Sequence, residues 1–232
     1  MRTIGLIGGM SWESTAIYYR RLNELVRDRL GGLHSAELLL RSFDFAPIAE
    51  RQGASDWAAL TAKMIDAARQ LEAAGSEAIV IGSNTMHRMA DDVAAAIGVP
   101  LLHIADAAAA AIKAAGSARP LLLGTKYTME SDFYRARLLA KHGIEVVLPD
   151  ASAREFVNRV IYDELCQGRI LAESRAAYLD IVEAAKARGA DGVIFGCTEV
   201  GLLIGGLDLG VPAFDTAELH CAAIVDVMLA EP

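Results

Sequence analysis

The stretches AAGSEAIVIGSNT at residues 73–85 and KARGADGVIFGCTE at residues 186–199 decide the fold of this chain. Each begins at the end of a helical pattern, continues into a short apolar run rich in β-branched residues, and closes with a glycine and three polar or reactive residues. Short apolar runs bounded in this way indicate buried strands of a parallel sheet. Because the two stretches resemble each other, we interpret the chain as one structural unit written twice.

A second pair of similar stretches occurs in the same order. GLIGGMSWES at residues 5–14 resembles LLLGTKYTMES at residues 121–131. Matched positions keep nearly constant offsets of 116, 114 and 112 residues, for Gly8 and Gly124, Ser83 and Cys197, and Pro100 and Pro212 respectively. Three blocks in register predict two βα lobes related by a pseudo-twofold axis.

Eight short apolar runs alternate with longer helical patterns. The predicted strands are residues 3–7, 37–43, 78–81, 100–103, 120–123, 145–148, 192–195 and 211–214. Strands that alternate with helices form parallel sheets covered on both faces. We therefore predict an α/β fold of two pseudo-symmetric lobes, each a four-stranded, mainly parallel sheet flanked by helices, with the active site in the cleft between them. The first lobe is expected to comprise residues 1–104 plus 215–232, and the second residues 105–214.

Composition and charge exclude several classes of protein. The chain has 232 residues, of which 53% are hydrophobic and 22% are charged, as is typical of a compact globular protein. Its net charge is −8 and its 22 Lys and Arg residues are scattered, so we expect no nucleic-acid partner. No run approaches the roughly 20 apolar residues of a membrane span. The apolar segment after Arg2 is too short for a secretory signal, so we expect a cytoplasmic protein without membrane contact.

Several familiar motifs are absent from the sequence. Cys166, Cys197 and Cys221 are an odd number at wide spacings, and the five histidines lack metal-ligand spacing. The segment GLIGG at residues 5–9 does not fit the dinucleotide motif GxGxxG, and no GxSxG elbow surrounds Ser83. We therefore expect no disulfide framework, no metal, no dinucleotide cofactor and no serine-hydrolase chemistry.

The candidate site consists of the residues that follow the strands, because ligands of open parallel sheets lie outside the carboxyl ends of the strands. The loops selected in this way are residues 8–10, 82–85, 124–128 and 196–199. A glycine before Ser83 and before Cys197 is expected to let the chain turn sharply into a helix, so that each side chain lies at a helix N-terminus. The repeat is expected to place these two side chains on opposite walls of one cleft.

Helix N-termini bind anions, so this site fits the carboxylate of a small substrate. The residues expected to bind it are Gly9, Met10, Asn84, Thr85, Thr125, Thr128 and Thr198. The positive end of a helix also lowers the pKa of a thiol, so we expect Cys197 to have thiolate character. Cys166 and Cys221, which lie within helical patterns, are expected to be core residues.

Four motifs together carry a family resemblance: IGGMSWEST at residues 7–15, SNT at 83–85, YDELCQG at 162–168 and GCTE at 196–199. Over essentially the whole chain, the sequence resembles the aspartate/glutamate racemase superfamily, nearest its aspartate racemase and broad amino-acid racemase branch. The resemblance implies that two bases remove and return the α-proton of a small amino acid without pyridoxal phosphate or another cofactor. It also implies that Cys197 is one base and that Glu199 assists it. We further expect a homodimer.

The sequence departs from the family pattern at the first base, where Ser83 stands in place of the usual cysteine. An alcohol is far less acidic than a thiol, whose reference pKa is about 8.5, so Ser83 is a poor direct base. We therefore expect racemisation to be biased toward one enantiomer. Ser83 could still relay a proton through water, assisted by His87 four residues later. Lys126 and Arg41 are the candidates by position for binding a substrate's side-chain carboxylate.

Two alternatives remain open from the residues alone. The first is a lyase or isomerase on the same scaffold, such as a malonate-type decarboxylase or a maleate isomerase. Decarboxylation needs only one proton donor, which fits Cys197 opposite Ser83. The second is a non-catalytic amino-acid-binding protein that has lost one base.

Overall fold

The computed structural model describes residues 1–230, which divide into two compact units. Unit 1 comprises residues 1–103 and the segment that begins at His220, and unit 2 comprises residues 104–219. The expected second lobe, residues 105–214, therefore lies inside unit 2, which continues to residue 219. The last two residues of the expected first lobe, 231 and 232, lie outside the described residues.

Unit 1 contains, within the described chain, a parallel sheet of four strands in the order β2-β1-β3-β4. Its strands are β1 (Ile4–Gly8), β2 (Leu38–Ser42), β3 (Ala78–Ile81) and β4 (Leu101–Leu102). The two central strands are entirely buried, as apolar runs without alternation predict. The four-stranded sheet predicted for the first lobe is confirmed.

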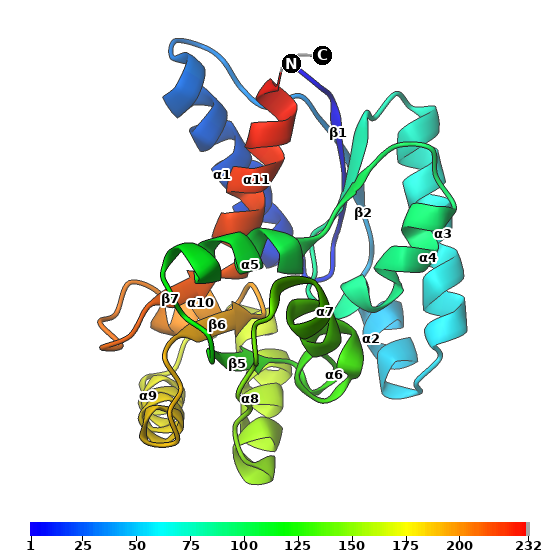
Figure 1. The fold of residues 1–232 in the computed structure, drawn as a ribbon. Coiled ribbons are helices and arrows are strands. Elements are labelled where there is room, and N and C mark those ends of the chain that lie inside the picture. Colours follow the sequence, from blue (N-terminus) through cyan, green and yellow to red (C-terminus); the bar gives the residue numbers. More distant parts are fainter. Residues whose placement is uncertain (231–232) are drawn as a thin grey trace. The chain divides into compact units, whose positions relative to one another are not determined.

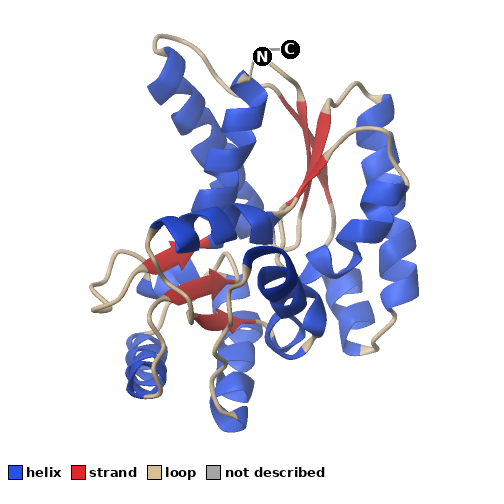
Figure 2. Ribbon diagram, viewed as in Figure 1, coloured by secondary structure: helices blue, strands red, loops and turns tan. Residues whose placement is uncertain are grey.

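Helices cover both faces of this sheet, as Figure 2 shows. The helices of unit 1 are α1 (Trp12–Leu30), α2 (Ala46–Gly53), α3 (Trp57–Ala73), the 3-10 helix η1 (Thr85–Met89), α4 (Ala90–Ala95) and most of α11 (Thr216–Leu229). Leu60, Met64 and Leu71 of α3 are buried in the core of unit 1, as their helical spacing predicts. Burial of each such side chain contributes about 1.5–3 kcal/mol to folding.

The C-terminal helix α11 returns to unit 1 and packs beside α1 (Figure 1). Arg29 of α1 forms an ion pair with Asp226 of α11, with 2.5 Å between Nη1 and Oδ1. The N–H of Arg2 donates to the carbonyl of Met228 at 2.8 Å, so the start of the chain is tied to the last turn of this helix. Unit 1 is therefore closed by segments from both ends of the described chain.

A buried histidine joins α11 to the sheet of unit 1. The Tyr18 hydroxyl lies 2.9 Å from Nδ1 of His220, and Nε2 of the same ring lies 3.1 Å from the carbonyl oxygen of Leu102. Because a carbonyl only accepts, Nε2 carries the hydrogen and Nδ1 accepts from Tyr18. Complete burial, with a smaller contribution from the nearby His87, lowers the pKa of His220 to about 3. The ring is therefore neutral in the folded protein except in strong acid.

Unit 2 repeats the arrangement with a shorter sheet. Its described strands are β5 (Leu121–Gly124), β6 (Val193–Gly196) and β7 (Ala213–Asp215), which are parallel and in the order β5-β6-β7. Its helices are α5 (Ile104–Ala114), α6 (Lys126–Glu130), α7 (Asp132–His142), α8 (Ala151–Asp163), the 3-10 helix η2 (Leu165–Gln167), α9 (Ala172–Ala187) and α10 (Val200–Ile204). By chain order and pairing, β6 takes the place in unit 2 that β3 takes in unit 1.

The predicted strand at residues 145–148 does not form, which corrects the expectation of four strands in the second lobe. Val147 makes an isolated parallel bridge to β5, and its N–H donates to the carbonyl of Pro120 at 2.9 Å. A longer ladder is blocked because Pro120 and Pro149 have no N–H to donate. Asp150 then caps the first turn of α8, so the chain passes directly into a helix.

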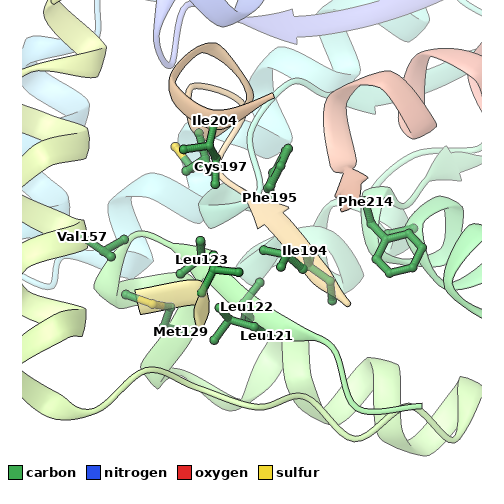
Figure 3. Close-up of a cluster of buried hydrophobic side chains, with 14 of the residues drawn as sticks. Leu121, Leu122, Leu123, Met129, Val157, Ile194, Phe195, Cys197, Ile204 and Phe214 are labelled. Carbon is green, nitrogen blue, oxygen red and sulfur yellow. The ribbon is translucent and has the colours of Figure 1, made fainter. Parts of the chain in front are cut away.

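The core of unit 2 gathers around its two longest strands. Figure 3 shows Leu122 and Leu123 of β5 in one cluster with Ile194 of β6, and Cys197 just beyond the end of that strand. All residues of β5 and β6 are buried. The core therefore fixes the place at which the chain leaves β6, and with it the position of Cys197.

Replacement of His220 by Gln is expected to reduce the loss of unfolding free energy that the native protein shows as the pH falls below about 6.5. The unfolded chain binds a proton on this histidine below about pH 6.5, whereas the folded chain does so only near pH 3. The free energy of unfolding therefore falls as the pH drops between these values, by about 1.4 kcal/mol per pH unit at most, and this group has no effect above pH 6.5. Gln keeps a donor and an acceptor but does not titrate. Denaturant titrations at neutral and at mildly acidic pH measure the difference.

His34 provides the control for this measurement, because its side chain is exposed. The variant His34→Gln is expected to keep the native dependence on pH. If His220→Gln also kept it, the neutral, hydrogen-bonded ring would not be a source of acid lability.

Candidate active site

The cysteine singled out by the sequence follows the middle strand of the unit 2 sheet. Gly196 ends β6, Cys197, Thr198 and Glu199 form the next turn, and α10 follows directly. The side chains of this turn are buried, with Cys197 9% and Glu199 2% exposed. Figure 3 shows the Cys197 side chain beside Ile204 of α10. The turn is therefore a buried group of polar side chains at the edge of an apolar core.

Neighbouring side chains donate hydrogen bonds to the carboxylate of Glu199. The Cys197 thiol lies 2.9 Å from Oε2, and the Thr198 hydroxyl donates to the same oxygen at 2.7 Å. The thiol of Cys166 lies 3.8 Å from Oε1. A carboxylate removed from water needs such donors. The structure thus brings Cys197, Thr198 and Glu199 together in one hydrogen-bonded group.

The expectation of thiolate character at Cys197 is wrong. Burial raises the pKa of this thiol well above its ordinary value, and the negative charge of Glu199 raises it further. α10 has only five residues and begins after Glu199, so its positive end does not offset these effects. The pair at rest is therefore a thiol that donates to a carboxylate.

The glycines before Cys197 and Ser83 do not act as predicted. Neither Gly196 nor Gly82 has a left-handed φ, so the turn at these positions does not require glycine. Gly196 instead lies close to β5, because a Cβ there would lie 2.5 Å from Cδ1 of Leu122 and 3.2 Å from the carbonyl oxygen of Leu123. A Cβ at Gly82 would lie 3.4 Å from its nearest neighbours, which is an ordinary contact distance.

Thr125 and Thr128, two of the residues expected to contact substrate, form a helix cap. Oγ1 of Thr125 accepts from the N–H of Thr128 at 3.3 Å, and the two hydroxyls lie 3.2 Å apart. Thr128 is completely buried, and Thr125 is 5% exposed. These hydroxyls fix the shape of the loop that joins β5 to α6.

The loop after β3 carries the corresponding residues of unit 1. Ser83, Asn84 and Thr85 are buried, and the helix that follows them is the 3-10 helix η1. Nδ1 of His87, on η1, lies 2.7 Å from the carbonyl oxygen of Ser83, so the ring donates to the backbone. His87 therefore fixes the main chain of Ser83, whereas the expected assistance concerned its hydroxyl.

The loop after β1 is fixed by Thr15. Its Oγ1 accepts from the N–H of Gly9 at 2.7 Å and donates to the carbonyl of Ser11 at 3.0 Å. Gly9 has a φ of +79°, and a Cβ there would overlap the backbone of Phe43, so only glycine fits. Gly9 and Met10, the candidate binding residues of this loop, are therefore held firmly at the carboxyl end of β1.

The cations considered for a substrate carboxylate have different surroundings. Arg41 of β2 lies over the Phe43 ring, with Cζ 4.7 Å from the centroid, and Lys63 of α3 lies over the same ring at 4.8 Å. In unit 2, Nζ of Lys126 lies 5.1 Å from the ring centroid of Tyr127. Lys63 was not evident from the sequence, because it approaches Phe43 only through the packing of α3.

Cys166 and Tyr162 belong to the site but were not singled out from the sequence. Burial is the main cause that raises the pKa of Tyr162 far above its ordinary value, so its hydroxyl stays protonated. Cys166 is half-buried and packs against the core of unit 2, as predicted, and its thiol also contacts the carboxylate of Glu199. The one sequence feature that could have pointed to these two residues was the motif YDELCQG, in which Tyr162 and Cys166 are four positions apart.

The remaining observations concern residues 1–230 as a whole. No three His, Cys, Asp or Glu side chains of this range are placed to share a metal ion. Over the same residues, no helix combines the length and the apolar character that crossing a bilayer requires. The three cysteines are all reduced.

These features define an α/β protein of two repeated units, in which a buried thiol–carboxylate pair follows the middle strand of one sheet. The family model of the Asp/Glu/Hydantoin racemases matches residues 7–224. The chain belongs to this family, and so to the racemases, which are isomerases. The resemblance inferred from the four motifs is confirmed.

Individual relatives agree with this assignment. A Yersinia pestis protein assigned to the Asp/Glu racemases is 52% identical over 99% of this chain and 100% of its own, with a TM-score of 0.92. An aspartate racemase homologue from Pyrococcus horikoshii is 36% identical over 99% of this chain and 100% of its own, with a TM-score of 0.85. The broad specificity amino-acid racemase RacX of Bacillus subtilis is 24% identical over 98% of both chains.

Gly196→Ala is expected to destabilise the protein, whereas Gly82→Ala is expected to be nearly neutral. The added methyl group at Gly196 would collide with Leu122 and crowd the backbone of β5, which costs about 1–3 kcal/mol. The same methyl group at Gly82 meets only ordinary contacts. Denaturant titration of the two variants measures the difference. Equal stabilities would contradict the packing role of Gly196.

Proposed function

We propose that this chain is a cofactor-independent racemase of acidic amino acids, which exchanges the α-proton of aspartate, glutamate or a related amino acid through Cys197. The observation that carries the proposal is the 2.9 Å contact between the buried Cys197 thiol and the carboxylate of Glu199. Family membership supports racemase chemistry, and the family description supports aspartate and glutamate as substrates.

In this proposal Glu199 is the base that activates Cys197. The carboxylate takes the thiol proton, and the thiolate removes the α-proton, so that the S–H bond reforms and the substrate becomes a carbanion delocalised over its carboxylate. A thiolate from a thiol of raised pKa is a stronger base than an ordinary cysteine thiolate. Glu199 releases its proton to solvent when the opposite face of the carbanion receives one, so the charges balance over the cycle.

The second proton is proposed to pass through Ser83. This residue follows β3, the strand that corresponds in unit 1 to β6 in unit 2. A serine hydroxyl can relay a proton from water but is too weakly acidic to provide a ready alkoxide base. Proton removal by Cys197 is therefore fast and proton removal by way of Ser83 is slow. Exchange of the α-proton with solvent is therefore expected to be faster for the enantiomer that presents this proton to Cys197.

Backbone and hydroxyl groups of four loops are proposed to bind the substrate. The residues are Gly9, Met10, Asn84 and Thr85 of unit 1, and Thr125, Thr128 and Thr198 of unit 2, with Thr128 acting through Thr125. Arg41 is proposed to attract the side-chain carboxylate, because it lies over Phe43, whose N–H donates to the carbonyl of Gly8 in the candidate loop after β1. Lys63 adds positive charge at the same ring.

Decarboxylation of a malonate is the second candidate function, and the protonated state of Cys197 favours it. A thiol of raised pKa is suited to deliver its proton to the carbanion that loss of carbon dioxide leaves. Product formation from an arylmalonate, without α-proton exchange in amino acids, would support this function over racemisation.

Incubation in D2O with each enantiomer of aspartate and glutamate tests the proposed function. Native protein is expected to introduce α-deuterium into at least one enantiomer, which mass spectrometry and chiral chromatography detect. Glu199→Gln is expected to slow this exchange about 10²–10⁴-fold, because the carboxylate that takes the thiol proton is lost.

Glu145→Gln is the matched control for this experiment. Its carboxylate is exposed and forms only a long surface ion pair of 3.8 Å with Arg119, so the native exchange rate is expected. Absence of α-deuterium from all four amino acids would contradict the proposed function, and binding without exchange would favour an amino-acid-binding protein.

Ser83→Cys is expected to speed proton removal from the disfavoured enantiomer. A thiol at this position is several pKa units more acidic than the alcohol, so it can supply the missing base. The measurement is the initial exchange rate of each enantiomer, with Ser83→Ala as the comparison. A faster exchange confined to the disfavoured enantiomer would support Ser83 as the second proton-transfer residue. An unchanged exchange rate in a folded Ser83→Cys variant would refute this role.

A further inference from the structure

We propose that Cys166 is a positioning residue, which holds Glu199 in the orientation that its action on Cys197 requires. This inference rests on the proposed function of the Cys197–Glu199 pair and adds a third side chain to it. Its basis is the placement of two thiols on the two oxygens of one carboxylate. Cys197 lies 2.9 Å from Oε2 of Glu199, and Cys166 lies 3.8 Å from Oε1.

The direction of the Glu199 carboxylate matters because its lone pairs lie in the plane of the group. The Cys197 thiol and the Thr198 hydroxyl both donate to Oε2. Two donors on one oxygen do not by themselves define the plane of the carboxylate. The Cys166 thiol contacts the other oxygen, and donors on both oxygens define the plane.

Cys166 reaches Glu199 because the chain folds tightly after α8. It lies in η2, where the preceding Leu165 is buried in the core of unit 2. The residue before η2, Glu164, accepts a hydrogen bond from the Ser174 hydroxyl of α9 at 2.6 Å. η2 also packs on α10, the helix that follows Glu199. These anchors hold a thiol against a carboxylate 33 positions away in the sequence.

Cys166 acts as a donor because Glu199 is the acceptor of this group. Burial keeps the pKa of the Cys197 thiol well above its ordinary value, so this thiol remains protonated. Burial likewise raises the pKa of the Tyr162 hydroxyl, which also remains protonated. A thiol is a weak donor. It can therefore orient the carboxylate without preventing it from taking the proton of Cys197.

Infrared spectra of the S–H stretch test the contact, because thiols absorb where other protein groups do not. The Cys166 band is the difference between native protein and Cys166→Ala. The Cys166 band is then measured again as the difference between Glu199→Gln and Glu199→Gln with Cys166→Ala, where an amide replaces the stronger carboxylate acceptor. The band of the native protein is expected at the lower frequency of the two. The band of Cys221, obtained with Cys221→Ala, is expected not to move, because this residue is buried on α11 in unit 1. Equal Cys166 frequencies in the two backgrounds would overturn the proposal.

Exchange of α-deuterium by two variants of similar size tests the consequence for catalysis. Cys166→Val removes the donor and is expected to lower kcat about threefold to tenfold with little change in KM, which is the effect of losing one hydrogen bond in the reacting group. Cys166→Ser keeps a donor and is expected to stay within about twofold of native. Equal losses in both variants would mean that Cys166 only fills space. If no variant or native protein exchanges substrate, the proposed function fails, and the infrared comparison still decides the role of Cys166.

Discussion

The hydrogen bond between the Cys197 thiol and the Glu199 carboxylate is the constraint on which the rest of the site depends. A carboxylate buried beside an apolar core is costly unless donors surround it. Here the donors come from Thr198, next in sequence, and from Cys166, which the fold brings from another element. The turn that carries the pair follows Gly196, where a Cβ would lie 2.5 Å from Cδ1 of Leu122 and 3.2 Å from the carbonyl oxygen of Leu123 on β5. The residues that pack the end of β6 against the core are therefore next to the residues that form the thiol–carboxylate pair.

The strands of unit 1 could be predicted, and the candidate loops selected, because both follow from repetition and from a general rule. The repeat matches Ser83 with Cys197, and ligands of parallel sheets lie after the strands, which together select the loops after β3 and β6. The strand expected at residues 145–148 has the composition of a strand but forms only one bridge. The length of a ladder depends on both partners, and the proline before β5, Pro120, limits this one.

The protonation of Cys197 shows why local rules fail at this site. A charge at a helix end gains about 0.3–1 kcal/mol, which is less than one pKa unit. Burial and an adjacent carboxylate change a pKa by several units, and here both raise it. The sequence displays the helix and Glu199 but not the depth of burial. Cys166 was missed for the same reason, because its contact with Glu199 spans 33 positions and depends on how η2 packs.

The repeat also makes the difference between the two units interpretable. In register with Cys197 and Glu199 of unit 2, unit 1 has Ser83 and Thr85, so both the thiol and the carboxylate are replaced at the equivalent positions. Beside Ser83 stands His87, which donates to the main chain and packs against a second histidine ring at 4.5 Å. Such surroundings fix the backbone of the loop but provide no strong base. The residues that follow β3 and β6 in register therefore carry different chemistry in the two units.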